Sequence, residues 1–412
     1  MKCRLCGAAL SAIFLDLGAA PPSNAFLSEE KLTQPEVYLP LKLFVCSECW
    51  LVQLPAHLSA AQTFTSEYVY FSSYSSSWVE HARRFVVRAV DRLQLTPASY
   101  VVEVASNDGY LLQHVLAHGI PCLGVEPTSG TAAAARSKGI DTIEAFFGAD
   151  AATRLASGQR ADLIVANNVL AHVPDINDFV AGFTRLLKPT GVATFEFPHL
   201  LRMVQENQFD TAYHEHYSYL SLTTAERIFA RCGLTVFDVE ELPTHGGSLR
   251  VFAQRSDSGR QAASPRVAAL RKTETEAGIA TAAFYSGFQA KAEKVKDDFV
   301  GFLIDARRRG LKVGAYGAAA KGNTLLNFAG ARPDLLPYVV DKNPAKQGKY
   351  MPGSRIPIVD EAHLQTDRPD RIVILPWNLR QEVMAQLAYV RDWGGQFVTA
   401  VPALAISKGR AA

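Results

Sequence analysis

The chain has 412 residues, which is more than one ordinary hydrophobic core holds and enough for two or three domains. With 48% apolar residues, 20% charged residues and a formal net charge of +2, it has a globular composition without the basic field that attracts nucleic acid. No apolar run reaches the roughly 20 residues of a membrane helix, and the first residues, MKCRLCGAAL, lack a signal peptide's apolar core. We therefore expect a cytoplasmic monomer with neither nucleic acid nor membrane as a partner.

The pattern of apolar segments predicts three domains. Residues 1–62 carry two cysteine pairs and several prolines. Residues 63–255 begin with a helical stretch and then alternate strand-like and helix-like segments, which favours a parallel sheet with crossover helices. Residues 256–412 begin with a linker and a long helical region and then repeat the strand-then-turn pattern. The predicted fold class is therefore α/β, with a small cysteine-bearing domain in front.

Two C-x2-C units, CRLC and CSEC, pair thiolates at the spacing that a tetrahedral zinc ion accepts. Unrelated buried cysteines or a redox pair are the alternatives. Paired spacing at both ends is hard to obtain by chance, and neither unit opens a helix after a strand, as thioredoxin-like redox pairs do. Four thiolates leave no open coordination position, so we predict a structural Zn²⁺ site. Its ligands would be Cys3, Cys6, Cys46 and Cys49.

The segment YVVEVASNDGYLLQHVL predicts a strand, a turn and a helix, with Glu103 inside the strand and Gly109 at the turn. The next predicted strand, CLGVEP, ends in Glu126, and an acid there can accept hydrogen bonds from both ribose hydroxyls. The loop lacks the glycines of G-x-G-x-x-G, so it is ill suited to a pyrophosphate. We predict an adenosine site, the alternative being an ordinary turn without a ligand. The polar residues of the loop are Ser106, Asn107 and Asp108.

These motifs resemble those of class I S-adenosylmethionine-dependent methyltransferases. VEVASNDGYLL and GVEP are similar to the first two motifs of that class, ADLIVANNVLAHVPD to its fourth strand and LLKPTGVATFEFP to its fifth. The usual E-x-G-x-G loop stands here as EVASN, a departure at both glycines. One subgroup shares that departure together with two C-x2-C pairs, a YHEH segment, a HGGSLR segment and a C-terminal α/β domain. It comprises the C-methyltransferases of deoxysugar biosynthesis, and the resemblance covers nearly the whole chain.

The resemblance implies a Rossmann-like methyltransferase domain between a zinc-binding domain and a C-terminal Rossmann-like domain. It implies that Glu103 or Asp108 orients the methionine portion of S-adenosylmethionine, with Ser106, Asn107 and Gly109 in the same loop. Glu126 would hold the ribose. The adenine would be flanked by one of two aromatic residues in EAFFG, Phe146 or Phe147. Asn167, after the fourth strand, would lie beside the sulfonium.

The stretch FDTAYHEHYSYLS concentrates groups that transfer protons. Methylating a carbon beside a carbonyl first requires a base, for which histidine is the natural candidate. A carboxylate can fix the imidazole tautomer, and a tyrosine or second histidine can donate to the enolate oxygen. The sequence alone does not say which histidine faces the substrate. For His214 a structural hydrogen bond to the backbone is the favoured interpretation.

The resemblance implies that His216 is the base, with Tyr213 and Glu215 as close partners. It also brings His172, from NNVLAHVPD, and Tyr70, from YVYFSSYS, into the same site as possible hydrogen-bond donors.

Candidate substrate-binding residues occur in two later segments. In PTHGGSLRVF, His245 and Arg250 flank two glycines, and Arg250 contacts either the substrate or a buried carboxylate. In KVGAYGAAAKGNTLLNF, Lys321 and Asn323 follow a strand-to-helix turn, where a helix N-terminus with a nearby lysine can hold phosphate. Trp377 of ILPWNL could stack on a nucleotide base. The alternative is a fold copy that only closes the site.

The leading hypothesis is a C-methyltransferase for a thymidine-diphosphate-linked 4-keto sugar, with ring carbon 3 or 5 as the acceptor. A methyltransferase with an oxygen or nitrogen acceptor, a non-catalytic binding module and an NAD-dependent enzyme are the alternatives. The missing phosphate glycines weaken the last of these.

Overall fold

Near-continuous runs of apolar, often β-branched residues form the strands of the central sheet, because parallel strands are buried on both faces. The computed structural model describes residues 1–64 and 71–407. The sheet has seven strands in the order β10-β11-β8-β7-β4-β5-β6. Strands β4 to β8 are parallel, β11 is antiparallel to β8, and β10 is antiparallel to β11. Their bounds are β4 (Val101–Val104), β5 (Cys122–Val125), β6 (Thr142–Ile143), β7 (Ala161–Asn167), β8 (Leu187–Pro198), β10 (Leu234–Leu242) and β11 (Ser248–Arg255).

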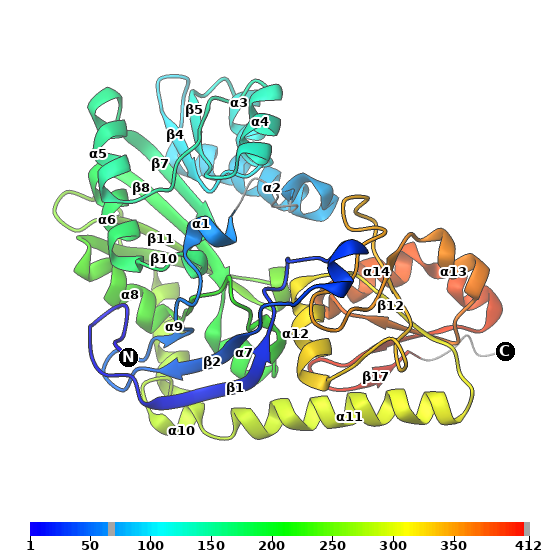
Figure 1. Cartoon of the computed structure of the whole chain (residues 1–412). Helices are drawn as coiled ribbons and strands as arrows, with labels where there is room; N and C mark the ends of the chain where they lie inside the picture. The colour runs from blue at the N-terminus through cyan, green and yellow to red at the C-terminus, as the bar shows by residue number, and fades with distance from the viewer. Residues whose placement is uncertain (65–70, 408–412) are drawn as a thin grey trace.

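Helices cover this sheet, and together they form what we call the central unit, residues 71–276 (Figure 1). The helix after the undescribed segment begins at Ser76, where the Ser75 hydroxyl accepts from the Trp78 backbone N–H, and it buries Ala82, Phe85, Val86 and Ala89 at helical spacing. The helices are α2 (Ser76–Leu93), α3 (Leu112–Ala117), α4 (Ser129–Ser137), α5 (Ala149–Gly158), α6 (Ile176–Leu186), α7 (Leu200–Gln205), α8 (Leu222–Arg231) and α9 (Pro265–Glu276). The last of them packs on β10 and α8.

The N-terminal unit, residues 1–64, is a small sheet that is completed by a strand from the central unit. Its order is β1-β2-β3-β9, and all three pairings are antiparallel. Strand β9 follows the YHEH segment directly, so that segment runs into the N-terminal sheet. The bounds are β1 (Ala12–Ala20), β2 (Leu39–Val45), β3 (Val52–Gln53), β9 (Ser218–Tyr219) and α1 (Ala60–Thr63).

The C-terminal unit, residues 282–407, is a second α/β sheet in the order β14-β13-β12-β15-β16-β17, parallel except for β17. Its first five strands repeat the order β6-β5-β4-β7-β8 of the central sheet. The strands are β12 (Val313–Tyr316), β13 (Val339–Val340), β14 (Ile358–Val359), β15 (Arg371–Ile374), β16 (Gln396–Thr399) and β17 (Ala405–Ile406). The helices are α10 (Ala282–Tyr285), α11 (Phe288–Arg308), α12 (Ala320–Ala329), α13 (Ala362–Asp367) and α14 (Arg380–Gln386).

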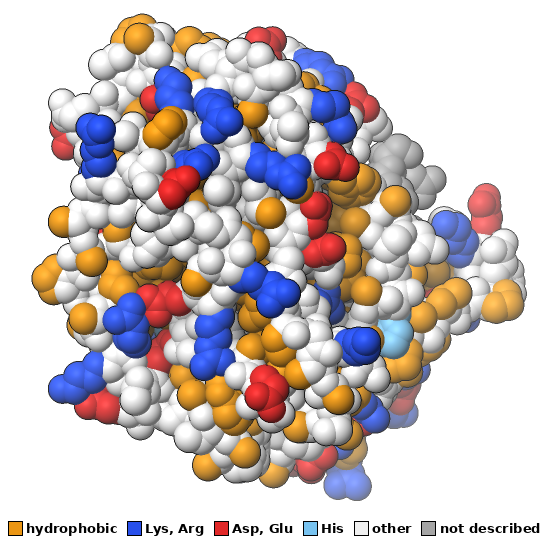
Figure 2. All heavy atoms as spheres, turned by 90° about the vertical axis from the view of Figure 1, so that its left-hand side faces the viewer, with side chains coloured by type: hydrophobic (Ala, Val, Ile, Leu, Met, Phe, Trp, Pro, Cys, Tyr) orange, Lys and Arg blue, Asp and Glu red, His pale blue; other side chains and the backbone are white. Residues whose placement is uncertain are grey.

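The N-terminal and C-terminal units share one hydrophobic core. Helix α11 runs beneath the N-terminal strands and on under the C-terminal sheet (Figure 1). Phe14 of β1 stacks on Phe288 of α11, with ring centroids 4.8 Å apart. Among the described residues, no helix has the length and apolar character needed to cross a membrane. One outer face of the molecule shows basic and acidic side chains interspersed rather than gathered into a patch of one sign (Figure 2).

Candidate active site

The loop after β4 bends back on the acid at the end of β5. Ala105 and Asn107 both have positive φ, 57° and 51°, which turns the backbone sharply. The Asn107 N–H then donates to Glu126 Oε2 over 2.9 Å, and the Thr128 N–H donates to Glu126 Oε1 over 2.9 Å. The carboxylate predicted to hold a ribose is therefore fixed at the loop where a bound nucleoside is expected.

Several buried polar atoms around this loop lack hydrogen-bond partners among the described residues. Such atoms cost about 1–3 kcal/mol each when nothing pairs with them, so they mark a place for a ligand. They lie at the carboxyl ends of β4 and β7, where the strand order reverses, and this is where ligands bind in open α/β sheets. Burial raises the pKa of Glu103 well above its usual range, against a hydrogen bond from Tyr110. The atoms are Glu103 Oε2, Ser106 Oγ, Asp108 Oδ1 and both side-chain atoms of Asn167. This donor and acceptor set fits the amino acid and sulfonium portions of S-adenosylmethionine.

The two phenylalanines of EAFFG differ in exposure. Phe147 packs against Phe179 and Phe183 of α6, with centroids 5.7 and 5.2 Å away. Phe146 is 48% exposed. Of the two residues predicted to flank an adenine, Phe146 is thus the one whose ring is not committed to the core.

The imidazole of His216 has a defined tautomer. Its Nδ1 lies 2.9 Å from the backbone carbonyl oxygen of Thr211, which can only accept, so Nδ1 carries the proton and Nε2 the lone pair. The ring lies 3.9 Å from the ring of Tyr213 and 4.6 Å from that of His172. Burial, reinforced by neighbouring His172, lowers the pKa of His216 well below its usual range. At neutral pH the residue is a neutral acceptor.

His172 joins this ring pair from the other side. It ends the short turn after β7, and the backbone N–H of Tyr217 donates to the Ala171 carbonyl over 2.8 Å, which ties the turn to the YHEH segment. Burial lowers the pKa of His172 to about 4, although a hydrogen bond with the Glu215 backbone opposes this. Its Nδ1 has no partner within the described parts of the chain. The structure therefore brings together two predicted site histidines that lie 44 positions apart in the sequence.

Glu215 does not contact the His216 imidazole as a tautomer-fixing carboxylate would. Its Oε1 accepts from Asn24 Nδ2 over 2.6 Å, so the side chain faces the N-terminal unit. The Thr211 carbonyl takes the place that the sequence assigned to a carboxylate. His214 also faces the N-terminal unit, with Nε2 3.2 Å from the Leu39 carbonyl oxygen, which confirms its predicted bond to the backbone. Tyr70 lies outside the described residues.

Lys321, Trp377 and His245 meet beside the same segment. Lys321 Nζ donates to Thr211 Oγ1 and to the His245 carbonyl, each over 3.2 Å, and lies 4.7 Å from the centroid of the Trp377 ring. Burial lowers the pKa of His245 to about 4. Gly246 permits the close approach of Trp377, because a Cβ there would lie 2.5 Å from the indole. These three predicted substrate-binding residues are thus gathered beside Thr211, the residue whose carbonyl contacts His216, although Trp377 is only 7% exposed.

Arg250 and Asn323 are both completely buried. The guanidinium of Arg250 lies 2.5 Å from Glu196 Oε2 and 3.3 Å from Glu240 Oε2. Of the two alternatives that the sequence left open for Arg250, the structure shows the contact with a buried carboxylate. The three residues are cross-strand neighbours on β8, β11 and β10, a register that the sequence does not reveal. Neither polar atom of the Asn323 side chain has a hydrogen-bond partner among the residues described.

Two titratable groups beside the predicted site residues, Asp210 and His81, were not predicted from the sequence. Asp210 accepts from Trp377 Nε1 over 2.8 Å, and burial raises the pKa of Asp210 to about 6 despite the charge of Lys321. Its place in FDTAYHEHYSYLS was the only available signal. His81 lies 2.9 Å from Glu196 Oε2 and also 2.9 Å from Arg250, and no motif pointed to it.

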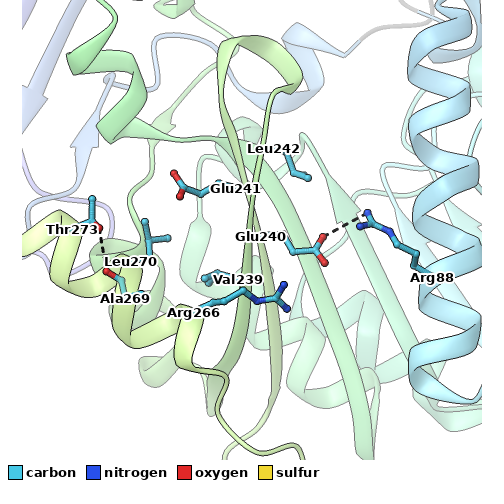
Figure 3. Close-up of a pocket in the computed structure, with 9 residues that line it drawn as sticks. All are labelled: Arg88, Val239, Glu240, Glu241, Leu242, Arg266, Ala269, Leu270 and Thr273. Atoms are coloured by element: carbon cyan, nitrogen blue, oxygen red, sulfur yellow. Dashed lines mark hydrogen bonds and ion pairs between the residues drawn. The ribbon is translucent and has the colours of Figure 1, made fainter.

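A surface pocket of about 380 Å³ lies apart from these residues, between α2, β10 and α9 (Figure 3). Arg88 and Glu240 meet across it at 3.7 Å. Its charged lining residues are of both signs, and none is a predicted site residue. The pocket therefore lacks the excess of one sign of charge that would attract an ionic ligand.

The four paired cysteines form one cluster in the N-terminal unit. Their sulfur atoms all lie within 4.8 Å of one another, with Cys3 and Cys49 3.5 Å apart and Cys6 and Cys46 3.6 Å apart. Tetrahedral zinc with Zn–S bonds of about 2.3 Å separates sulfurs by about 3.8 Å, so the cluster fits that ion. In each pair a residue of positive φ, Gly7 or Trp50, donates its N–H to the carbonyl of the first cysteine over 2.9 Å. Two matching turns thus present the four thiolates.

Three family models match the chain. They describe a "Putative zinc binding domain" over residues 3–64, a "Methyltransferase domain" over 78–239 and a "C-methyltransferase C-terminal domain" over 243–402. The C-methyltransferase NovU of Streptomyces niveus is 33% identical over 402 residues, which are 97% of this chain and 95% of NovU. The strand order and the zinc cluster, with these models, define a class I S-adenosylmethionine-dependent methyltransferase that carries a structural zinc site. The chain belongs to the C-methyltransferase family.

Solved structures are more distant. Magnesium protoporphyrin IX methyltransferase of Synechocystis PCC 6803 is 15% identical, with 43% of this chain and 85% of that chain covered and a TM-score of 0.36. An S-adenosylmethionine-dependent methyltransferase of Mesorhizobium loti is 16% identical, with 43% and 100% covered and a TM-score of 0.34. Similarity this slight carries nothing about the chemistry of the present site.

Proposed function

We propose that this C-methyltransferase acts on a nucleotide-diphosphate-linked 4-keto-deoxysugar, with thymidine as the nucleoside. In this proposal His216 removes the proton from a carbon beside the ketone, and that carbon then receives the methyl group. The zinc-binding N-terminal unit is structural, and the C-terminal unit grips the nucleotide. The family supports C-methylation, and the ketone explains why such an enzyme would need a base.

One observation carries the proposal: the imidazole of His216, whose tautomer leaves the lone pair on Nε2, lies against the turn that follows β7. The Thr211 carbonyl holds the proton on Nδ1, and the ring of His172, at the end of β7, lies 4.6 Å away. A base must have its lone pair available before the substrate arrives. Because the pKa of His216 is lowered, nearly all molecules meet this requirement at neutral pH.

Residues at the carboxyl ends of the central strands would hold the cofactor. Glu126 would accept from the ribose hydroxyls, Glu103 and Asp108 would face the methionine portion, and Phe146 would flank the adenine. Asn167, whose side-chain amide has no partner among the described residues, would lie beside the sulfonium. When bound, S-adenosylmethionine supplies an electrophilic methyl group.

The chain's own residues would perform the proton chemistry. His216 Nε2 takes the proton from the α carbon, and the electron pair of that C–H bond becomes the enolate double bond. Tyr213, whose ring lies against His216, donates a hydrogen bond to the enolate oxygen as its charge develops. The enolate carbon would then be the nucleophile for the methyl group that bound S-adenosylmethionine supplies, and His216 releases its proton to solvent.

The C-terminal unit repeats the acid arrangement of the cofactor site, which supports a role for it in gripping the nucleotide. Asp341, after β13, accepts from the Ala318 N–H at Oδ2 and from the Asn343 N–H at Oδ1, each over 2.8 Å. Glu126 accepts in the same way from the loop after the neighbouring strand and from the residue two positions on. Asp341 would thus receive the thymidine sugar, with the diphosphate reaching toward Lys321 and His245.

The proposal is tested by incubating the enzyme in D2O with dTDP-4-keto-6-deoxyglucose, with and without S-adenosylmethionine, and following both by mass spectrometry. We expect deuterium to enter the carbon beside the ketone without cofactor, and a gain of one methyl group with it. An enzyme that methylates oxygen or nitrogen needs no such exchange.

The matched variants are H216Q and H214Q. Glutamine can still donate to a backbone carbonyl in either position, but it is no base. Loss of one general base lowers such rates by about 10² to 10⁴-fold, so H216Q should nearly abolish exchange, whereas H214Q should retain it. Exchange that survives in H216Q at the wild-type rate rules out this residue as the base.

A further inference from the structure

Three side chains of the C-terminal unit hold three consecutive residues just before the YHEH segment. Trp377 Nε1 donates to Asp210 Oδ2 over 2.8 Å, and Lys321 Nζ donates to Thr211 Oγ1 over 3.2 Å. Thr324 Oγ1 donates to the Ala212 carbonyl over 2.7 Å. Lys321 and Thr324 stand on α12, while Trp377 begins the short turn after β15.

The residues that they hold lead directly to His216. Phe209–Thr211 form a single 3-10 turn, and the Ala212 N–H donates back to the Phe209 carbonyl over 3.0 Å. The Thr211 carbonyl belongs to the same peptide plane as that N–H, and it is the acceptor for His216 Nδ1. With Asp210 anchored before this peptide plane and the Ala212 carbonyl anchored after it, the direction of the Thr211 carbonyl is fixed.

We propose that Thr324 and Trp377 are positioning residues for the base: by fixing the Thr211 carbonyl, they keep the proton of His216 on Nδ1 and the lone pair on Nε2. This rests on the proposed role of His216. The C-terminal unit then has a part in proton removal that is separate from any grip on the nucleotide.

The burial of both residues argues against direct contact with substrate. Thr324 is 2% exposed, and its hydroxyl is engaged with the Ala212 carbonyl. Trp377 is 7% exposed, its N–H is engaged with Asp210, and Gly246 and Lys321 lie against its ring. The predicted stacking of this indole on a nucleotide base would require it to leave all of these contacts.

The test uses the isosteric variant T324V and the variant W377F, which keeps an aromatic ring but removes the donor. W393F is the matched control, because Trp393 lies in the same unit and its Nε1 also donates to an acceptor, the Pro369 carbonyl, over 3.1 Å. Long-range ¹H–¹⁵N spectra of the [¹⁵N]histidine-labelled full chain report the tautomer, and the His216 signals are identified by their absence in H216Q. Exchange kinetics in D2O with dTDP-4-keto-6-deoxyglucose give kcat and KM for the same proteins.

In wild type and W393F we expect the His216 nitrogens to show a protonated Nδ1 and an unprotonated Nε2. In T324V and W377F both tautomers should be populated, and kcat for exchange should fall about three- to tenfold, as for loss of one hydrogen bond, while KM stays within about twofold. A pure Nδ1–H tautomer in both variants overturns the inference, as does a rise in KM at unchanged kcat. If wild type exchanges no deuterium at all, the proposed function fails, while the spectra still decide whether these residues set the tautomer.

Discussion

Burial determines the protonation state in which His216 meets its substrate. The side chain loses water on all sides, and its neighbours His172, His245 and Lys321 add no negative charge to compensate. The pKa of His216 is therefore lowered, which makes the residue a weaker base but keeps every molecule in the competent, neutral form. The arrangement suits a reaction in which the acidity of the carbon beside a ketone does part of the work.

The pH dependence of the reaction follows from that lowered pKa. Protonated His216 cannot accept a proton, so activity is lost as pH falls through the pKa of the free enzyme. Because that pKa lies below the ordinary histidine value, we expect kcat/KM to remain level as pH falls through about 6.5 and to decline only further into the acidic range. Initial rates across a pH series check this, and a decline centred at or above pH 6.5 contradicts it.

Arg250 shows how a buried charge depends on its neighbours. Burial alone would raise the pKa of Glu196, but the hydrogen bond with His81 and the charge of Arg250 lower it to about 2, so the pair is ionised throughout the physiological range. We expect E196Q to leave the guanidinium poorly compensated and to reduce the free energy of unfolding by about 3 kcal/mol.

Urea denaturation measures that loss, and E241Q is the control. Glu241 pairs with Arg202 at 2.8 Å, but both side chains are largely exposed, so its loss should change stability by less than about 1 kcal/mol. If E196Q and E241Q lower the free energy of unfolding by the same amount, the buried charge of Arg250 does not need Glu196 for its stabilisation, and Arg250 is free for another role.

At the scale of elements, short strands and turns position the residues of the proposed site. Sequence analysis predicted β4, β5, β7 and β8 of the central sheet and the strand-then-turn pattern of the C-terminal unit, because apolar runs between turn signals indicate buried parallel strands. It did not single out the two-residue strands β6 and β14 or the last strands β16 and β17. Strand β9 was not predictable in the same way, since it has two residues and its partner β3 lies more than 150 residues earlier. The same holds for the Trp377–Asp210 bond and for the cross-strand neighbours of Arg250, because register and contacts between units leave no local pattern.

Among the predicted site residues, too, those placed by a local motif were predictable and those oriented by another unit were not. Motif spacing placed Glu103 correctly inside β4 and Glu126 correctly at the end of β5, because the carboxyl end of a parallel strand is a local feature. The orientation of Glu215 depends on Asn24, a residue of another unit, and could not be read from the YHEH segment itself.

The pairing of β9 with β3 leads to a prediction about zinc. The four thiolates join the turn before β1 to the turn between β2 and β3, and β3 pairs with the chain just after His216. In the variant C46S we expect loss of bound zinc and faster amide hydrogen exchange in the peptide covering residues 213–219, with kcat for the methyl transfer falling more than the affinity for S-adenosylhomocysteine.

Elemental analysis and hydrogen-exchange mass spectrometry check this outcome. C232S is the control, because Cys232 ends α8 and lies outside the cysteine cluster, so its zinc content and exchange should match wild type. If C46S lacks zinc but residues 213–219 exchange at the wild-type rate, the zinc site does not stabilise the segment that carries His216, the proposed base.

At the scale of the whole molecule, two sheets share the order of five strands, and the segment that carries the proposed base contacts both other units. Residues 209–219 receive hydrogen bonds from α12 and the Trp377 turn, and they also pair with the N-terminal sheet. The shared core, to which α11 contributes one face, joins the N-terminal and C-terminal units. Movement of either unit would therefore displace His216, the proposed base, relative to the central sheet.

The repeated strand order predicts a division of labour between two acids. If Glu126 holds the ribose of the cofactor and Asp341 the sugar of the nucleotide, each should matter for one ligand alone. We expect E126Q to weaken binding of S-adenosylhomocysteine about 10- to 100-fold, as for loss of a hydrogen bond to a charged group, and to leave dTDP binding unchanged. D341N should show the reverse.

Isothermal titration calorimetry of both ligands against both variants measures the four affinities. Loss of both ligands in D341N would indicate that Asp341 serves only the fold of its loop, through the Ala318 and Asn343 amides, and that the nucleotide is held elsewhere.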